Sequence, residues 1–245
     1  MKIRYNQTGK KLYETGVSDG VLFIQQSTGQ YNKGVGWDGL TKVSESPTGG
    51  ESTALYANNV KYGEITSTEE YGGTIEAYTY PDEFEQADGS AEVAEGVTIG
   101  QQKRASFGLA YKTAIGNDVN GLDLGYKIHL VYGAKIKPSA KEYNTINNSP
   151  TAITFSWEFT STPVEVPGAS PSATLVINST KIKDKEKLKK LEDMIWGTDP
   201  SDVSPHTDGE QQTGTDGQPQ QTGTDPKLPT IEEIIQLIGP KPLEG

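Results

Sequence analysis

Two alternating runs of apolar and polar residues, joined by a segment rich in Gly, Asn and Asp, occupy the middle of the chain. They cover residues 104–115 and 126–137. A period of two over this length predicts β-strands with one buried face. The predicted core positions are Ala105, Phe107, Leu109, Tyr111, Thr113, Ile115, Tyr126, Ile128, Leu130, Tyr132, Ala134 and Ile136. Because the joining segment, residues 116–125, is too long for a two-residue turn, we expect it to project as a loop.

Shorter runs of the same kind, separated by turn signals, fill most of the remaining first 180 residues. They predict strands over residues 12–17, 21–25, 40–45, 53–58, 60–69, 71–80, 151–160 and 173–178. Strands at this spacing with little helix between them are typical of an antiparallel β-sandwich or an open barrel. The predicted fold is therefore mainly β, with one packed α-helix, a long central hairpin and a flexible C-terminal extension.

The composition changes sharply after the predicted helix, residues 183–196, whose apolar stripe is Leu188, Leu191 and Ile195. Residues 197–229 are rich in Thr, Gly, Asp, Gln and Pro and contain QQTGTD twice, which predicts a flexible low-complexity linker. The stretch IEEIIQLI within residues 230–245 predicts a short docking helix followed by a tail. We therefore divide the chain into a β domain (1–196), a linker (197–229) and a docking segment (230–245).

The targeting signals of exported and membrane proteins are not found in the sequence. The chain has no cysteine, which excludes disulfides and cysteine-based metal sites. Its first sixteen residues lack the apolar core of a secretory signal, and no run approaches the roughly 20 apolar residues of a membrane span. We expect a protein that is made in the cytoplasm and has no membrane partner.

Charge is unevenly distributed along a chain of net charge −11. Residues 45–95 carry twelve acids and one base, residues 103–141 seven bases and two acids, and residues 181–190 six lysines and two acids. The pattern indicates either complementary surfaces between copies of the protein or solvated faces that happen to cluster. The acidic candidates for an interface between copies are Glu64, Glu69, Glu70, Glu76, Asp82 and Glu83. The basic candidates are Lys103, Arg104, Lys112, Lys127, Lys135, Lys185, Lys187 and Lys189.

Catalytic and metal-binding patterns are weak. The two histidines, His129 and His206, lie in a predicted strand and in the linker, and no nucleophile-elbow motif accompanies them. Oxygen ligands in the GNDVNGLDLG segment do not follow EF-hand spacing and are better explained by turn formation; they are Asp118, Asn120 and Asp123. Carboxylates among residues 69–85 would suit a glycosidase only if two of them faced a cleft. We therefore predict no enzymatic activity and no cofactor.

Nucleic-acid recognition is also not indicated. The basic face predicted for the hairpin carries Arg104, Lys112, Lys127, Lys135 and Lys137, which are able to contact phosphates. No aromatic residues alternate with them on that face, so it offers no platform on which bases would stack.

Several motifs, in a fixed order, resemble one known family. They are GLTKVSESPTGGE (39–51), YANNVKYGEITS (56–67), YTYPDEFEQADG (78–89), FGLAYKTAIGNDVNG (107–121) and GYKIHLVYG (125–133). Together they are similar to the major tail tube proteins of long, flexible-tailed, non-contractile bacteriophages of Gram-positive hosts. The similarity covers residues 16–196 and resumes at LPTIEEIIQLI, and the QQTGTD repeats look like an insertion between the two parts.

This resemblance implies a structural virion protein. Six copies would form a ring, and stacked rings would form the tail tube through which double-stranded DNA passes without sequence recognition. The implied partners are copies of the same chain, a tape-measure protein and the tail terminator and tip proteins, with assembly in the host cytoplasm. Candidate contacts between rings are Ser46, Pro47, Thr48, Gly49, Gly50, Asn117, Asp118 and Asn120.

A different class of function stays open, which is a non-catalytic carbohydrate- or receptor-binding β-sandwich of a tail tip or a cell surface. Trp37, Trp157 and the many tyrosines motivate it, because a sugar-binding platform needs several exposed aromatic rings. Trp157, however, alternates in phase with Phe155 and Phe159, which indicates a core position.

Overall fold

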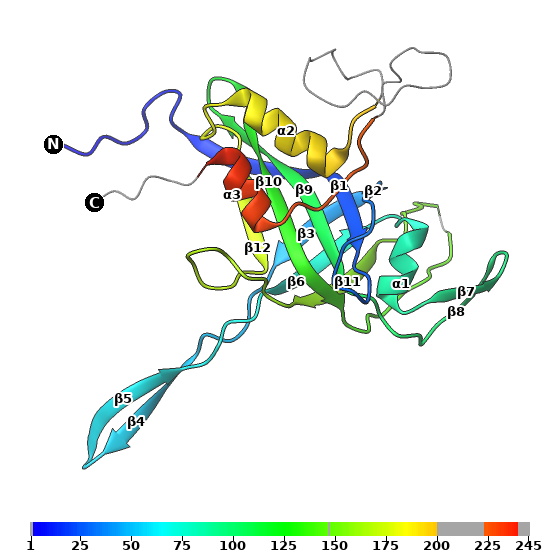
Figure 1. The fold of residues 1–245 in the computed structure, drawn as a ribbon, viewed down its shortest axis with the longest axis horizontal. Helices are drawn as coiled ribbons and strands as arrows, with labels where there is room; N and C mark the ends of the chain where they lie inside the picture. Colours follow the sequence, from blue (N-terminus) through cyan, green and yellow to red (C-terminus); the bar gives the residue numbers. More distant parts are fainter. Residues whose placement is uncertain (1, 147, 200–222, 240–245) are drawn as a thin grey trace.

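The computed structural model describes residues 2–146, 148–199 and 223–239 and confirms the predicted mainly-β, antiparallel fold (Figure 1). Seven strands follow one another across the main sheet in the order β2-β1-β9-β10-β11-β6-β3, and β12 pairs with β10 beside β11. Their bounds are β1 Leu12–Ile24, β2 Val35–Trp37, β3 Leu40–Glu45, β6 Gly72–Ala77, β9 Phe107–Asn117, β10 Gly121–Ile136, β11 Phe155–Ser161 and β12 Thr174–Asn178.

The central hairpin, β9 and β10, is buried on both faces. Where Val131 pairs with Leu109 and Ala134 pairs with Phe107, β10 contains one extra residue, which is a β-bulge. Gly133 lies in this bulge with φ 57°, a left-handed conformation that glycine adopts without strain. The bulge reverses the alternation of β10, so the prediction that Tyr132 shares a face with Ala134 and Ile136 is wrong.

The register also separates the apolar residues of the two strands. Phe107, Leu109 and Tyr111 face one core, whereas Ile128, Leu130 and Tyr132 face another on the opposite side of the sheet. A shift of one residue in the pairing of two strands exchanges their faces, and alternation within each strand does not define that pairing. The expectation that only one face of the hairpin would pack in a core is therefore wrong.

The first core, which we call the aromatic core, lies where the curved sheet folds over itself. The rings of Trp37, Phe84 and Trp157 contact one another, with centroid separations of 4.6 to 5.9 Å. Phe84 belongs to a short helical segment formed by η1 (Asp82–Phe84) and α1 (Glu85–Asp88). Aromatic pairs at such distances and tilts stabilise a core beyond the area they bury.

The second core, which we call the helix-covered core, lies between the hairpin and two helices, α2 (Lys185–Trp196) and α3 (Ile231–Ile238) (Figure 1). Asp184 caps α2 by accepting hydrogen bonds from the backbone N–H groups of Glu186 and Lys187, and Thr230 and Glu233 form a capping box on α3. The predicted docking helix thus packs on its own chain.

The segment that precedes α3 differs from the predicted flexible linker over residues 223–229. Leu228 is buried in the helix-covered core, and the carbonyl oxygen of Pro226 accepts a hydrogen bond from Gly34 N–H. Thr198 and Thr224 are joined by hydrogen bonds of 2.9 and 3.0 Å, so the chain leaves and re-enters the described structure at neighbouring points. The rest of the predicted linker, residues 200–222, lies outside the described residues.

Two hairpins project from the main sheet (Figure 1). The longer one consists of β4 (Ser52–Ala57) and β5 (Val60–Thr66), and we call it the arm, with its connections from Ser46 to Glu70. The shorter one consists of β7 (Ala91–Ala94) and β8 (Val97–Ile99). Both pair only internally, because neither belongs to the main sheet.

Replacing Gly133 by alanine is expected to lower the free energy of unfolding by about 2 kcal/mol, because a left-handed conformation strains an L side chain. A Cβ atom there would also lie 2.7 Å from the carbonyl oxygen of Thr162. Urea unfolding of the two proteins measures the difference. Gly36→Ala is the matched control, since no heavy atom lies within 4 Å of its Cβ position. Equal stability of both variants would contradict the proposed role of the bulge.

Candidate functional site

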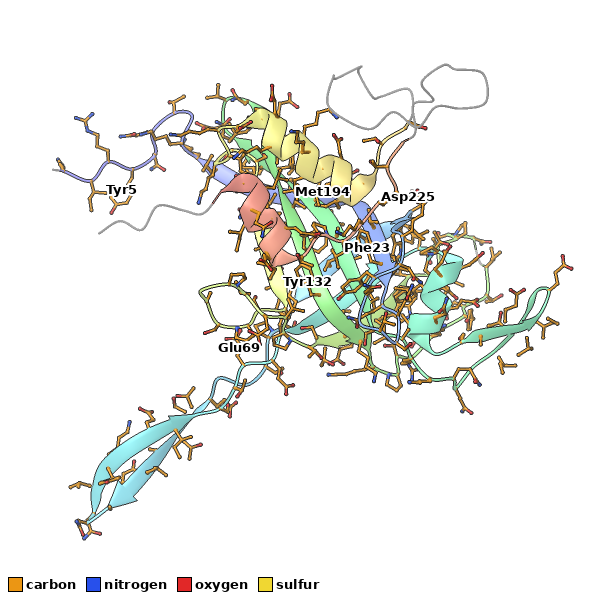
Figure 2. All side chains as sticks on the ribbon, in the orientation of Figure 1. Tyr5, Phe23, Glu69, Tyr132, Met194 and Asp225 are labelled. Carbon is orange, nitrogen blue, oxygen red and sulfur yellow. The ribbon has the colours of Figure 1, made fainter. Side chains whose placement is uncertain are left out.

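The acidic candidates divide into those that pair within the chain and those that do not. Glu64 on the arm lies 3.0 Å from Lys61, and Glu76 in β6 lies 2.9 Å from Lys42. Four others are exposed and form no ion pair within the described residues, namely Glu69, Glu70, Asp82 and Glu83. Glu69 marks the base of the arm in Figure 2. These four carboxylates are available to a partner.

The basic face predicted for the hairpin does not exist, because Lys112 and Lys127 lie on opposite sides of the sheet. Lys112 pairs with Ile128, and Lys127 pairs with Thr113, and directly paired residues share a face.

Both of these lysines form ion pairs with carboxylates of their own chain. Lys112 Nζ lies 3.1 Å from a carboxylate oxygen of Glu192 and 4.1 Å from the ring centroid of Trp196, so it joins β9 to α2. Lys127 forms an ion pair with Glu14.

The lysines of α2 also contact their own chain. Lys185 Nζ donates to the carbonyl oxygen of Ser179 at 2.8 Å, and Lys187 Nζ donates to that of Ile238, the last residue of α3, at 3.2 Å. Lys189 lies 2.9 Å from Asp193. Of the remaining basic candidates, Arg104 is half-buried, whereas Lys103 and Lys135 are exposed and form no ion pair in the described part of the chain.

The two candidate inter-ring loops lie on separate parts of the molecule (Figure 1). Residues 46–50 begin the arm, where Thr48 and Glu70 exchange backbone hydrogen bonds. Asn117, Asp118 and Asn120 form the turn between β9 and β10. The expectation of a projecting loop over residues 116–125 is wrong, because the strands continue to Asn117 and Gly121. Asp118 accepts hydrogen bonds from the N–H groups of Gly9 and Lys11, which hold the N-terminal segment against the turn.

A partly buried polar cluster that the sequence does not reveal lies where the arm joins the sheet. The imidazole of His129 stacks on the ring of Tyr111, with centroids 4.6 Å apart, and its Nε2 lies 2.9 Å from Thr113 Oγ1. Glu45, the last residue of β3, accepts a hydrogen bond of 3.4 Å from the Tyr111 hydroxyl and lies 3.9 Å from His129 Nδ1.

Burial dominates the electrostatics of this cluster. It lowers the pKa of His129 below its ordinary value, although the nearby Glu45 carboxylate acts in the opposite direction. It raises the pKa of Tyr71, the first residue after the arm, to about 12. His129 Nδ1 and the Tyr71 hydroxyl are buried without a hydrogen-bond partner in the described structure. Burial therefore favours the neutral forms of His129 and Tyr71, and the polar groups of the cluster are only partly satisfied.

The arm carries the largest concentration of exposed apolar side chains on one element of the described structure. Side chains along both strands point into solvent (Figure 2). Near the tip, the exposed fractions are 73% for Tyr56, 62% for Val60 and 79% for Tyr62, and Leu55 and Ile65 are also exposed. Sequence patterning predicts these strands but not their projection, because alternation alone does not reveal which face meets a core.

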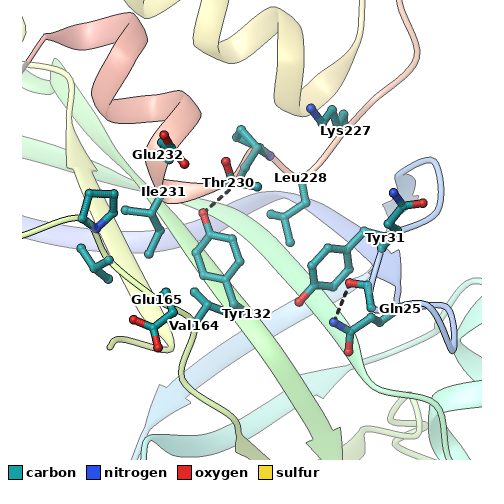
Figure 3. Close-up of a pocket in the computed structure, with 15 residues that line it drawn as sticks. Gln25, Tyr31, Tyr132, Val164, Glu165, Lys227, Leu228, Thr230, Ile231 and Glu232 are labelled. Carbon is teal, nitrogen blue, oxygen red and sulfur yellow. Dashed lines mark hydrogen bonds between the residues drawn. The ribbon is translucent and has the colours of Figure 1, made fainter. Parts of the chain in front are cut away.

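A pocket of about 750 Å³ opens beside the helix-covered core (Figure 3). Its floor includes the rings of Tyr31 and Tyr132, and its walls come from the β1–β2 loop, residues 164–167 and the start of α3. The Tyr132 hydroxyl donates to the carbonyl oxygen of Pro229, and the Tyr31 hydroxyl accepts from Gly133 N–H. The carboxylates considered for glycoside cleavage do not line it. Pockets of this size accommodate small molecules or a few side chains.

Lowering the pH from 7.5 to 5 is expected to destabilise the protein through His129. Because its pKa is lower in the folded state, the unfolded state takes up the proton first once the pH falls through about 6.5. This part of the stability is fully present above that pH. Urea unfolding midpoints at several pH values measure this loss of stability, and His129→Gln should make the midpoint depend less on pH. His206→Gln is the control and should leave the pH dependence as it is. A His129→Gln variant with the same pH dependence as the natural chain would show that His129 is not responsible.

Neither a metal-binding cluster nor a membrane-spanning helix occurs among the described residues. No group of three or more His, Asp or Glu side chains there is arranged to hold a metal ion. Within the same residues no helix is both long and apolar enough to span a bilayer. No protein-family model matches the chain, and no curated protein was found to be similar to it.

Proposed function

We propose that this protein is the major tail tube subunit of a long, non-contractile bacteriophage tail. Six copies form a ring, and stacked rings form the conduit for double-stranded DNA. Its partners are other copies of the chain and the tape-measure, terminator and tip proteins. The ordered series of motifs described above supports this proposal, and the projecting arm is the structural observation that carries it.

The arm supports the proposal of assembly because contacts with its own domain contribute little to its stability. An isolated two-stranded hairpin is only marginally stable in water, and the arm pairs with no third strand in the described structure. Exposed tyrosine and aliphatic side chains on such an element are typical of a contact surface. Contact with another copy would remove these side chains from water.

The type of contact also agrees with a ring or a tube. Both faces of the central hairpin are filled by the chain's own cores, so a neighbour has access mainly to the arm, the loops and the sheet edges. A projecting element that meets a different surface of the next copy makes a heterologous contact. Repetition of such contacts generates a closed ring or an open stack.

The alternative function, carbohydrate or receptor binding, loses its predicted aromatic platform. Trp37 and Trp157 are buried in the aromatic core, so their rings are not available to a sugar. The pocket beside Tyr31 is the feature that still favours this alternative, because it combines an aromatic ring with side-chain amides and carboxylates.

Negative-stain electron microscopy of the purified full chain tests the proposal. We expect rings or tubes at some concentration and ionic strength, with or without the tail partners. A protein that stays strictly monomeric under all of these conditions would refute it. Specific binding of a glycan by such a monomer would favour the alternative.

Reversing the charges at the base of the arm is expected to weaken assembly. Glu69→Lys combined with Glu70→Lys changes two exposed carboxylates that have no cation partner in the described structure. Charges at the rim of an interface act mainly at low salt, so the loss should be largest there. Sedimentation measures the assembled fraction.

The control for this experiment is Glu95→Lys combined with Glu142→Lys, which makes the same change in net charge at exposed positions away from the arm. Compensating reversals among Lys185, Lys187 and Lys189 test whether α2 is the opposing surface. Rings that form normally in the Glu69/Glu70 variant at low salt would show that these carboxylates are not at an interface.

A further inference from the structure

We infer that the tip of the arm on one copy of this chain fills the pocket beside Tyr31 and Tyr132 on a second copy. The inference rests on the proposed self-assembly and specifies its contact. Four observations carry it: the chemistry of the tip, the lining of the pocket, the charges at both places and the reach of the arm.

The tip presents aromatic, aliphatic and cationic groups together. Tyr56 pairs with Lys61 across the arm, so their side chains lie on one face, and Val60 and Tyr62 flank Lys61 in the sequence. Lys61 is about half exposed, and its ion pair with Glu64 on the surface of the arm contributes little stability. Lys61 is therefore free to exchange Glu64 for a carboxylate on a partner. Tyrosine side chains are among those that contribute most to binding energy at protein interfaces.

The pocket offers a matching apolar surface. Tyr31 and Leu228 lie on one side of Tyr132, and Val164 and Ile231 lie on the other (Figure 3). Val166 also lines the pocket. Its volume of about 750 Å³ is sufficient for one or two tyrosine side chains. The pocket is supported by Tyr132, whose hydroxyl is held by the Pro229 carbonyl, so its floor is already formed before a partner arrives.

The pocket lining carries two carboxylates and one lysine, Lys227, which is already paired with Glu233. Glu165 and Glu232 line the pocket, are exposed and have no cation partner among the described residues. Lys61 is the single basic residue between positions 45 and 95 of the sequence, and it lies at the tip of the arm. An ammonium group brought to the rim would be attracted by these carboxylates, which favours placing Lys61 beside the pocket.

The geometry requires a second copy. The ribbon of β4, Ser52–Ala57, is extended and spans roughly 20 Å at about 3.3 Å per residue, and it is joined to the sheet by the connections that begin at Ser46. In Figure 1 this ribbon runs away from the domain, and its tip lies far from α3, which borders the pocket. The tip therefore does not reach the pocket of its own chain.

Cysteine cross-linking between two single-cysteine chains tests this contact, because the natural sequence contains no cysteine. One full-length chain carries Asn59→Cys at the tip, and the other carries Gln30→Cys in the exposed lining of the pocket. After mixing, a short bis-maleimide should join them into a covalent dimer. Glu95→Cys, at the turn of the β7–β8 hairpin, is the matched control and should not be joined to Gln30→Cys.

Electron microscopy of the same samples separates this inference from the proposed function. Rings or tubes with no more cross-linking than the control would overturn the inference and leave the tail tube proposal in place. Specific cross-linking without rings or tubes would support the contact and count against the tube. If neither is seen, both are wrong.

A charge exchange provides a second measurement that does not depend on cysteine geometry. Lys61→Glu in the natural, cysteine-free chain is expected to weaken its self-association, measured by sedimentation, about fivefold at low salt. Adding Glu165→Lys and Glu232→Lys to the same chain should restore it. Circular dichroism verifies that each variant is folded. Restoration supports the contact. A folded Lys61→Glu variant that associates as well as the natural chain would show that Lys61 does not lie beside Glu165 and Glu232.

Discussion

The pairing of β9 with β10 is the interaction on which the rest of the structure depends. Alternation places Val131 and Tyr132 on opposite sides of the sheet, and the extra residue at Gly133 brings Ala134 to the side of Val131, so that β10 fills two cores. The aromatic core joins the two halves of the curved sheet, and the helix-covered core attaches α2 and α3. Without the bulge, the end of β10 would present its apolar residues to the wrong side.

Filling both faces of the central hairpin has a direct effect on how the protein can interact. Cationic side chains that would otherwise form an exposed surface are used to hold elements of the same chain together, as Lys112 does between β9 and α2. The exposed apolar surface is concentrated instead on elements that leave the sheet. The rigid part of the molecule and the part available to partners are therefore largely separate.

Much of the fold is predictable from local patterns, whereas its three-dimensional pairing is not. Alternation around Leu109 and Leu130 predicts both long strands, and the apolar stripe of Leu188, Leu191 and Ile195 predicts the packed helix. The register between the strands, and hence the opposite positions of Lys112 and Lys127, depends on tertiary contacts that alternation within a strand does not encode. The polar cluster is not predictable from these patterns, because Glu45, Tyr71 and His129 are far apart in the sequence and meet only in the folded chain.

The hydrogen bonds between Thr198 and Thr224 make this position a natural point of insertion. The folded domain fixes these two threonines side by side. Joining two such points by a longer flexible chain costs only about 0.6 kcal/mol in loop-closure entropy for each doubling of the length. A change of length between these threonines is therefore compatible with α2 and α3 keeping their places, which makes the position suitable for inserting a peptide or a small domain.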